Sequence, residues 1–105
     1  MAASQNLSYA AAAILAAVDA GYGYGLSVIE MTGLPSGTVY PALRRLEEGK
    51  YLASQWESER IAMKEQRPSR KYYTVTARGR DLLNSTLERY PLLRKIEAAP
   101  AGGRR

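Results

Sequence analysis

The chain of 105 residues contains neither cysteine nor histidine. Without cysteine it forms no disulfide framework, no cysteine-based zinc site and no thiol nucleophile. Without histidine it lacks the usual general base, the imidazole metal ligand and the Ser-His-Asp and Cys-His arrangements of hydrolases. No paired carboxylates or activated nucleophile replace them. The sequence therefore predicts a protein that is not an enzyme and that holds no cofactor and no metal ion.

Long hydrophobic runs are also missing. The alanine-rich run after Tyr9 is much shorter than the ~20 apolar residues that a membrane-spanning helix needs. The first six residues, Met1–Asn6, carry no basic residue, and no cleavage pattern of a secretory signal follows them. These absences predict a cytoplasmic protein with no membrane partner, and the length suits one small domain.

Basic residues are absent from the first 43 positions, whose only charges are Asp19 and Glu30. All 15 lysines and arginines lie from Arg44 onward, and the net charge is +5. This division predicts that the neutral first half of the chain forms packing contacts and that the second half presents a basic face to a polyanion. Nucleic acid is the commonest polyanion, although charge alone would also fit an acidic protein or a membrane surface.

The stretch Gly33–Gly49, GLPSGTVYPALRRLEEG, organises the rest of the chain. Apolar residues recur at helical spacing along one stripe of it: Val39, Leu43 and Leu46. The opposite face carries hydroxyl, aromatic and cationic groups, which suits a helix in the major groove of DNA. Taken alone, the stretch fits an ordinary amphipathic helix equally well. Because Pro41 would cost a hydrogen bond inside a regular helix, we expect the regular part to begin near Thr38.

Two helices are predicted before this stretch. The first, Leu7–Ala20, is small and apolar nearly all round, which indicates burial on more than one side and hints at a subunit interface. Gly21–Gly25, GYGYG, follows a helix rather than a strand and lacks a Walker lysine, so we interpret it as a turn and not as a phosphate loop. Leu26–Thr32 is a second, short helix, and together with the central stretch it makes a helix-turn-helix unit.

After the central stretch the apolar period changes to two. Alternation from Leu52 to Glu57 predicts one strand, and Arg70–Thr76, RKYYTVT, predicts another. The polar segment Ser58–Ser69 between them is expected to be the long, mobile, basic tip of a β-hairpin. Thr76 is expected to cap a last helix, which Pro91 should kink or stop.

The predicted order is helix, helix, helix, strand, strand, helix, which is the winged helix-turn-helix arrangement of a mainly α, α+β protein with the hairpin as its wing. We expect a disordered N-terminus over residues 1–6 and a winged-helix DNA-binding domain over 7–97. Within that domain, residues of about 77–97 are expected to form a dimerisation helix. Residues 98–105 should be a flexible tail.

Three blocks resemble the PadR-type transcriptional regulators of the short form: Tyr22–Leu26, YGYGL; Leu34–Gly49, LPSGTVYPALRRLEEG; and Arg67–Arg80, RPSRKYYTVTARGR. The resemblance extends over roughly residues 7–90. It implies a homodimeric winged helix that binds a palindromic operator in double-stranded DNA, usually as a repressor. The sequence departs from the family pattern at Gln66, where a glycine is usual, at Arg78, where an acidic residue is common, and at Pro91.

The resemblance also implies which residues bind DNA. The DNA-reading helix contributes Ser36, Gly37, Thr38, Tyr40 and Arg44, with Arg45 on its flank, and the wing contributes Arg67, Arg70 and Lys71. We expect Arg44 to contact guanine, and Thr38 and Tyr40 to fix phosphate or sugar. The residues expected at the dimer interface are Leu15, Val18, Leu83, Leu87, Tyr90 and Leu93.

Two other functions stay open. The winged helix is also used as a protein-interaction module, with the apolar first helix and the leucine-rich last helix as its binding surfaces. A dimer crevice lined by Tyr9, Trp56 or Tyr90 would instead hold a small aromatic effector. A salt-sensitive shift on duplex DNA would separate DNA binding from the interaction module.

Overall fold

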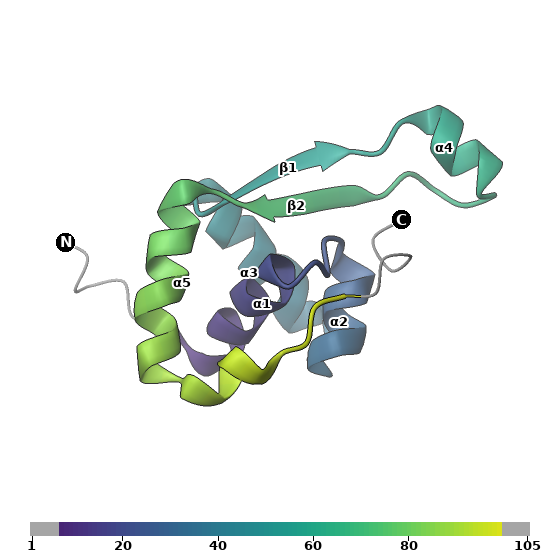
Figure 1. Ribbon diagram of the computed structural model, residues 1–105. Coiled ribbons are helices and arrows are strands. Elements are labelled where there is room, and N and C mark those ends of the chain that lie inside the picture. Colours follow the sequence, from purple (N-terminus) through teal and green to yellow (C-terminus); the bar gives the residue numbers. More distant parts are fainter. Residues whose placement is uncertain (1–6, 100–105) are drawn as a thin grey trace.

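The computed structural model describes residues 7–99, so the predicted disordered N-terminus and residues 100–105 of the predicted tail lie outside the described residues. The elements follow in this order: α1 Tyr9–Asp19, α2 Gly25–Thr32, α3 Ser36–Glu48, β1 Leu52–Trp56, α4 Glu59–Lys64, β2 Lys71–Val75, α5 Ala77–Arg89 and the 3-10 helix η2 Pro91–Lys95. The α+β winged-helix architecture is confirmed (Figure 1). No helix among residues 7–99 is long and apolar enough to cross a membrane.

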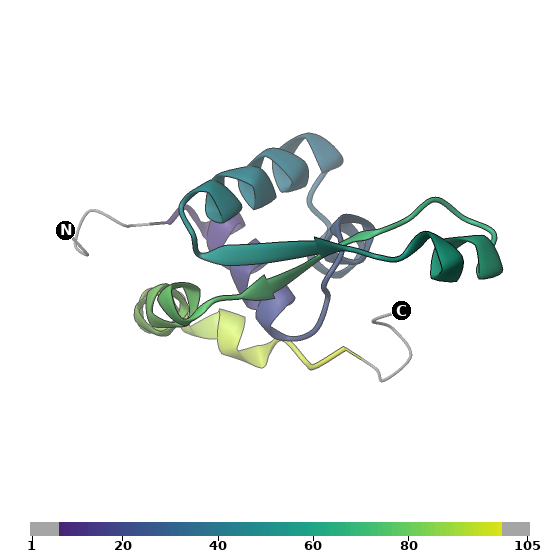
Figure 2. The ribbon, with the colours of Figure 1, turned by 90° about the horizontal axis from the view of Figure 1, so that it is seen from above.

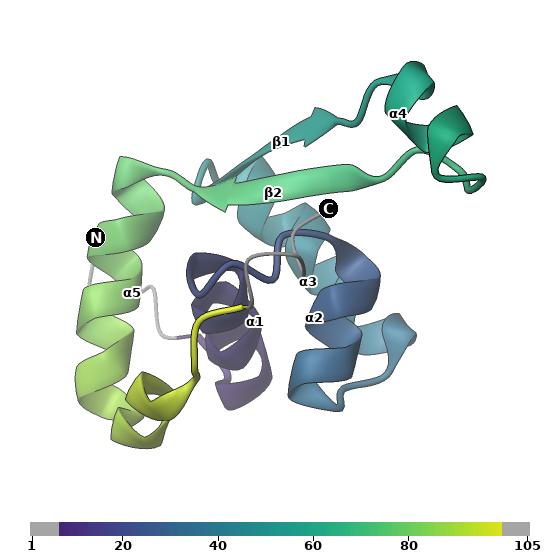
Figure 3. The ribbon, with the colours of Figure 1, turned by 45° about the vertical axis from the view of Figure 1, so that its right-hand side comes forward.

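Helix α1 is the centre of the hydrophobic core. The Ser8 side chain caps it by accepting a hydrogen bond from the Ala11 N–H, and every residue from Ala12 to Val18 is buried. Its neighbours are α2, α3, α5, β2 and η2, and Figure 3 shows it between α5 and α2. The alanine-rich, apolar surface that hinted at a subunit interface is therefore covered within a single chain.

Helix α3 begins at Ser36 and not near Thr38, so the predicted start is wrong. The N–H groups of Thr38 and Val39 both donate to the Pro35 carbonyl, at 2.9 and 3.0 Å, which forms a regular first turn. Pro41 lies inside the helix, and because proline has no N–H the carbonyl four residues earlier, at Gly37, loses its helical donor. Gly37 is exposed, so water can take that place. The predicted apolar stripe Val39, Leu43 and Leu46 is buried.

Helix α3 ends at Glu48, and the turn that follows it begins at Gly49. Gly49 directly follows the helix with φ −80°, and the left-handed residue is Lys50, with φ 69°. The Tyr51 N–H donates to the Leu46 carbonyl and the Lys50 N–H to the Glu47 carbonyl, both at 2.9 Å, which is the Schellman pattern. Gly49 is needed for space, because a Cβ atom there would lie 2.8 Å from the Tyr51 ring.

The wing is an antiparallel hairpin in which Leu52 pairs with Val75, Ser54 with Tyr73 and Trp56 with Lys71. The hairpin extends beyond the helices, with α3 on one side of it and α5 and η2 on the other (Figure 2). A third segment adds to its edge, where the Tyr73 N–H donates to the Gly23 carbonyl at 2.7 Å.

The segment Ser58–Ser69 forms the tip of the hairpin, but it is not a simple loop. It contains α4, whose first turn is capped by the Ser58 hydroxyl accepting from the Ile61 N–H, and whose Ala62 is buried. The helix has only six residues, too few for an apolar period to stand out in the sequence.

Thr76 caps the last helix, α5, as predicted: its hydroxyl accepts from the Gly79 N–H at 3.0 Å. The same hydroxyl donates to the Lys50 carbonyl at 2.7 Å and so ties α5 to the end of α3. Pro91 stops the helix: α5 ends at Arg89, and Pro91 opens η2. The observed helices and strands otherwise lie within one or two residues of the predicted bounds.

Candidate nucleic-acid interface

The outer face of α3 gathers most of the residues predicted to bind DNA. Thr38 is half-buried, and the others are exposed opposite the buried stripe: Ser36, Gly37, Tyr40, Arg44 and Arg45. Within residues 7–99 neither Arg44 nor Arg45 forms an ion pair. Within residues 7–99 no side chain caps the start of α3, so the N–H groups of Ser36 and Gly37 are left as donors for an anion.

Tyr40 is held against the start of α2. A Cβ atom on Gly25 would lie 2.2 Å from Cε1 of Tyr40, so only glycine lets the ring occupy this position. The glycine-rich turn and the central stretch are therefore parts of one site. This contact explains a glycine at position 25 better than any need for an unusual backbone angle.

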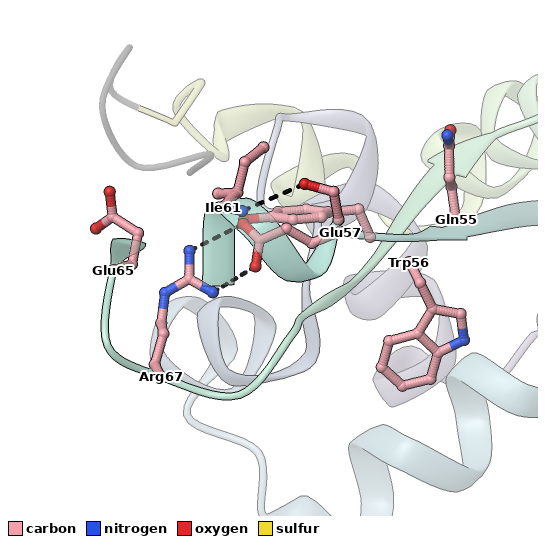
Figure 4. A pocket seen from close by; sticks show the side chains of 8 residues that line it. Gln55, Trp56, Glu57, Ile61, Glu65 and Arg67 are labelled. Atoms are coloured by element: carbon pink, nitrogen blue, oxygen red, sulfur yellow. Dashed lines mark hydrogen bonds and ion pairs between the residues drawn. The ribbon is translucent and has the colours of Figure 1, made fainter. Parts of the chain in front are cut away.

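Arg67 is committed to an ion pair inside the wing. Its Nη1 and Nη2 donate to Oε1 and Oε2 of Glu57, at 2.5 and 2.9 Å, in the bidentate geometry of strong arginine–carboxylate pairs (Figure 4). The Glu57 side chain is 5% exposed and that of Arg67 19%. The Arg67 hydrogen bond lowers the pKa of Glu57, and Glu57 raises the pKa of Arg67. Arg67, which was predicted to bind phosphate, therefore also holds the segment before β2 against the end of β1.

The guanidinium of Arg70 is held by tyrosines, while the Arg70 backbone N–H donates to Oε1 of Glu57 at 3.3 Å. Its guanidinium lies over the Tyr24 ring, 4.0 Å from the centroid, and its Nη1 donates to the Tyr72 hydroxyl at 3.4 Å. Tyr24 and Tyr72 meet edge to face with centroids 5.5 Å apart. A cation over an aromatic face keeps its charge while its orientation is limited.

Lys71 joins the wing to α3. Its Nζ lies 3.3 Å from Oε1 of Glu47, whose other carboxylate oxygen accepts a hydrogen bond from Ser54. The pKa of Glu47 is lowered, first by the Ser54 hydrogen bond and then by Lys71, and the pKa of Lys71 is raised by Glu47. Two of the predicted wing cations therefore have carboxylate partners, while the arginines of α3 have none within the described part of the chain.

A cleft of about 590 Å³ separates the wing from α2 and α3. Aromatic and apolar side chains line both of its walls: Tyr24, Leu26, Tyr40, Trp56 and Tyr73. Sequence reasoning missed Leu26 and Trp56 as members of this face. The signal for Trp56 was its place on the same strand face as Leu52 and Ser54, at the far end from the core.

The residues predicted for the dimer interface lie mostly inside the chain's own core. Four of them are buried within the single chain and leave little surface for a partner: Leu15, Val18, Leu83 and Leu93. The other two, Leu87 and Tyr90, are partly buried against the same core. Leu92, on the same side of the molecule, is 67% exposed. Dimerisation itself stays a prediction.

The three aromatic residues expected in an effector crevice do not meet in one chain. Tyr9 and Tyr90 pack edge to face, 5.1 Å apart, and the Tyr90 hydroxyl donates to the Leu7 carbonyl. Trp56 is instead the last residue of β1, a strand of the extended hairpin (Figure 1).

Comparison with known proteins relates the chain to one group of regulators. A sequence model of the transcriptional regulator PadR-like family matches residues 14–85. The fold resembles that of a PadR family transcription regulator from hypervirulent Clostridium difficile R20291, with a TM-score of 0.68 and 24% identity over 85% of this chain and 94% of that one. A PadR-like transcription factor from Bacteroides fragilis matches with a TM-score of 0.61 and 26% identity over 81% of this chain and 82% of that one. No curated protein matches the chain.

Proposed function

Because the chain belongs to the PadR-like family of transcriptional regulators, we propose that it binds double-stranded DNA in a sequence-specific manner. In this proposal two copies act as a homodimer on a palindromic operator and repress transcription. The observation that carries it is the outer face of α3, where Arg44 and Arg45 are exposed and form no ion pair among the described residues.

The proposed roles follow from the chemistry of each group. Arg44 lies one turn after Tyr40, and its guanidinium has the fork that reads guanine in the major groove. Ser36, Thr38 and Tyr40 contact phosphate or sugar and set the position of the helix on the duplex. The uncapped N–H groups at the start of α3 receive a phosphate.

The wing has a secondary role in this proposal. Arg70, whose guanidinium lies over the Tyr24 ring, contacts the DNA backbone. Arg67 and Lys71 also contact the backbone to the extent that DNA displaces Glu57 and Glu47 from them. Residues 7–97 act as one DNA-binding domain, and about 77–97 contribute the dimer contact.

The test is the loss caused by Arg44→Ala. The operator is first selected from a random duplex library, and binding is then measured on the operator, on a single-base variant and on random duplex. Removal of a bidentate guanine contact should cost about 1–3 kcal/mol on the operator and flatten the preference at one base pair per half-site.

Arg94→Ala is the matched control, because it removes the same charge from η2, on the other side of the hairpin from α3 (Figure 2). It should bind all three duplexes nearly as the wild type does. Equal losses for Arg44→Ala on every duplex would show that Arg44 anchors the backbone only. Absence of any salt-sensitive duplex binding by the wild type would contradict the proposed function itself.

A further inference from the structure

Trp56 is the single tryptophan of the chain, and its side chain is 64% exposed. Residues of one strand face alternate, so Trp56 projects to the same side of the hairpin as Leu52 and Ser54. Along this face Leu52 is buried in the core and Ser54 is half-buried against Glu47. Trp56 is the next residue on this face. It lies on the side of the hairpin that faces the helices, but beyond the part of the hairpin that the helices cover.

The wall opposite Trp56 is also apolar and exposed. Tyr40 of α3 is 46% exposed and Leu26 of α2 is 51% exposed, and both line the same cleft as Trp56. A single exposed apolar side chain needs no explanation, but several from different elements around one hollow mark a binding surface.

The charge of the cleft indicates what it binds. Three cations line it, Arg67, Arg70 and Lys71, and no carboxylate among residues 7–99 does. Glu57 and Glu47 lie just outside the lining and pair with Arg67 and Lys71, so the guanidinium of Arg70 is the lining cation without an ion pair among the described residues. The ligand must therefore combine negative charge with an apolar surface that packs on aromatic rings. The sugar-phosphate backbone of DNA has both, and the cleft adjoins the α3 face through Tyr40, which belongs to both surfaces.

We propose that Trp56 is a DNA-contacting residue that closes the cleft over one strand of the duplex. Its ring packs on a deoxyribose of the strand that passes between the wing and α3, and Arg70 and Lys71 lie beside the flanking phosphates. The proposal rests on the proposed function and adds an apolar anchor to the wing, whose predicted contacts were all cationic. Because sugars carry no sequence information, this contact strengthens binding to every duplex alike.

A single tryptophan makes the test direct, since all tryptophan fluorescence comes from this site. Quenching by acrylamide is measured with the full chain alone and saturated with operator duplex or random duplex. We expect severalfold protection of Trp56 by both duplexes. Trp56→Ala should weaken both by about tenfold, the order expected when one aromatic side chain loses its buried contact, and Trp56→Phe should restore most of the loss.

Ile61→Ala is the matched control, because Ile61 is an exposed apolar residue of the wing outside this cleft. It should bind both duplexes as the wild type does. Duplex binding that leaves Trp56 open to acrylamide, with Trp56→Ala unchanged, would overturn this inference and leave the proposed function intact. Failure of the wild type to bind any duplex would overturn both. Stronger protection by polyglutamate than by duplex would assign the cleft to an acidic protein instead.

Discussion

Single residues that break the expected pattern have local physical explanations. Arg78 lies in the first turn of α5, where the positive end of the helix dipole disfavours a cation, but its side chain binds the end of α3. Its Nε donates to the Gly49 carbonyl at 2.9 Å, and its guanidinium lies over the Tyr51 ring, 4.5 Å from the centroid. A cation at the end of α3 bonds a free carbonyl and suits the negative end of that helix dipole. Arg78, which stands where an acidic residue is common, therefore caps the end of α3.

Lys50 and Gln66 are the described non-glycine residues with positive φ, at 69° and 59°. Each occupies the left-handed position of a Schellman motif, after α3 and after α4 respectively. A side chain costs ~1–2 kcal/mol in this region, whereas glycine adopts it freely but loses more chain entropy on folding. We therefore predict that Lys50→Gly and Gln66→Gly each stabilise the protein by about 0.5–1 kcal/mol.

Urea unfolding of the two variants measures this gain. Gly33→Ala is the reverse control, because Gly33 has φ 74° with nothing within 4 Å of an added Cβ atom. It should lose about as much stability as the other two gain, through backbone strain alone. A neutral or destabilising Lys50→Gly would mean that the lysine side chain makes a compensating contact.

At the scale of elements, two ion pairs hold the wing in place. Glu57 pairs with Arg67 inside the wing, and Glu47 of α3 pairs with Lys71 of the wing. Both have pKa values lowered from 4.5, Glu57 mainly by Arg67 and Glu47 mainly by Ser54. A lowered folded-state pKa gives stabilisation that is present above about pH 4.5 and is lost as the pH falls through the lowered value. We predict that the wing loosens in acid before the helical core unfolds.

Because Trp56 is adjacent to Glu57, its fluorescence should change over this acid range, while the circular dichroism signal of the helices stays constant. Glu57→Gln, which keeps the shape but removes the charge, should give at neutral pH much of the change that acid causes in the wild type. Glu59→Gln is the control, because Glu59 is exposed and has no ion pair among the described residues. Simultaneous loss of both signals in acid would show that the wing and the core are one cooperative unit.

At the scale of the whole molecule, the proposed homodimer should scatter light with twice the 11.6 kDa chain mass at micromolar concentration. Leu92→Glu should dissociate it without unfolding, because Leu92 is exposed within the region expected to dimerise. Leu87→Glu is a less clean test, since Leu87 packs against the core and the change would also cost stability. Ile61→Glu adds the same charge to the wing and should stay dimeric. A wild type that is monomeric at every concentration would remove the two-half-site arrangement.

Salt dependence reports how many cations reach phosphate in the proposed complex. If only Arg44, Arg45 and Arg70 act in both subunits, about six neutralisations give a log–log slope of roughly −5. If DNA also draws Lys71 from Glu47 and Arg67 from Glu57, about ten neutralisations give roughly −9. Titrations of duplex across a salt series, repeated with Glu47→Gln, distinguish the two, and a slope near zero would exclude the basic face as the binding surface.

The sequence by itself determined the features that depend on neighbours within one helical turn or one strand. The spacing of Val39, Leu43 and Leu46 predicted the buried face of α3, Thr76 predicted the cap of α5, and Pro91 predicted its end. These signals are local, because dihedral limits and hydrogen bonds to residues three or four positions away produce them. The resemblance to the PadR-type regulators likewise followed from short motifs.

Tertiary structure alone decided which surfaces and charges remain available. The apolar residues of α1 were consistent with a subunit interface until five other elements were seen to cover them. Arg67 and Lys71 resembled free phosphate ligands, but their carboxylate partners lie 10 and 24 positions away in the sequence, at Glu57 and Glu47. The exposure of Trp56 is likewise a tertiary feature, because it depends on how far α3 covers the hairpin. No local pattern encodes such pairings, because Arg67 meets Glu57 only when the tip of the hairpin forms, and Lys71 meets Glu47 only when the hairpin packs against α3.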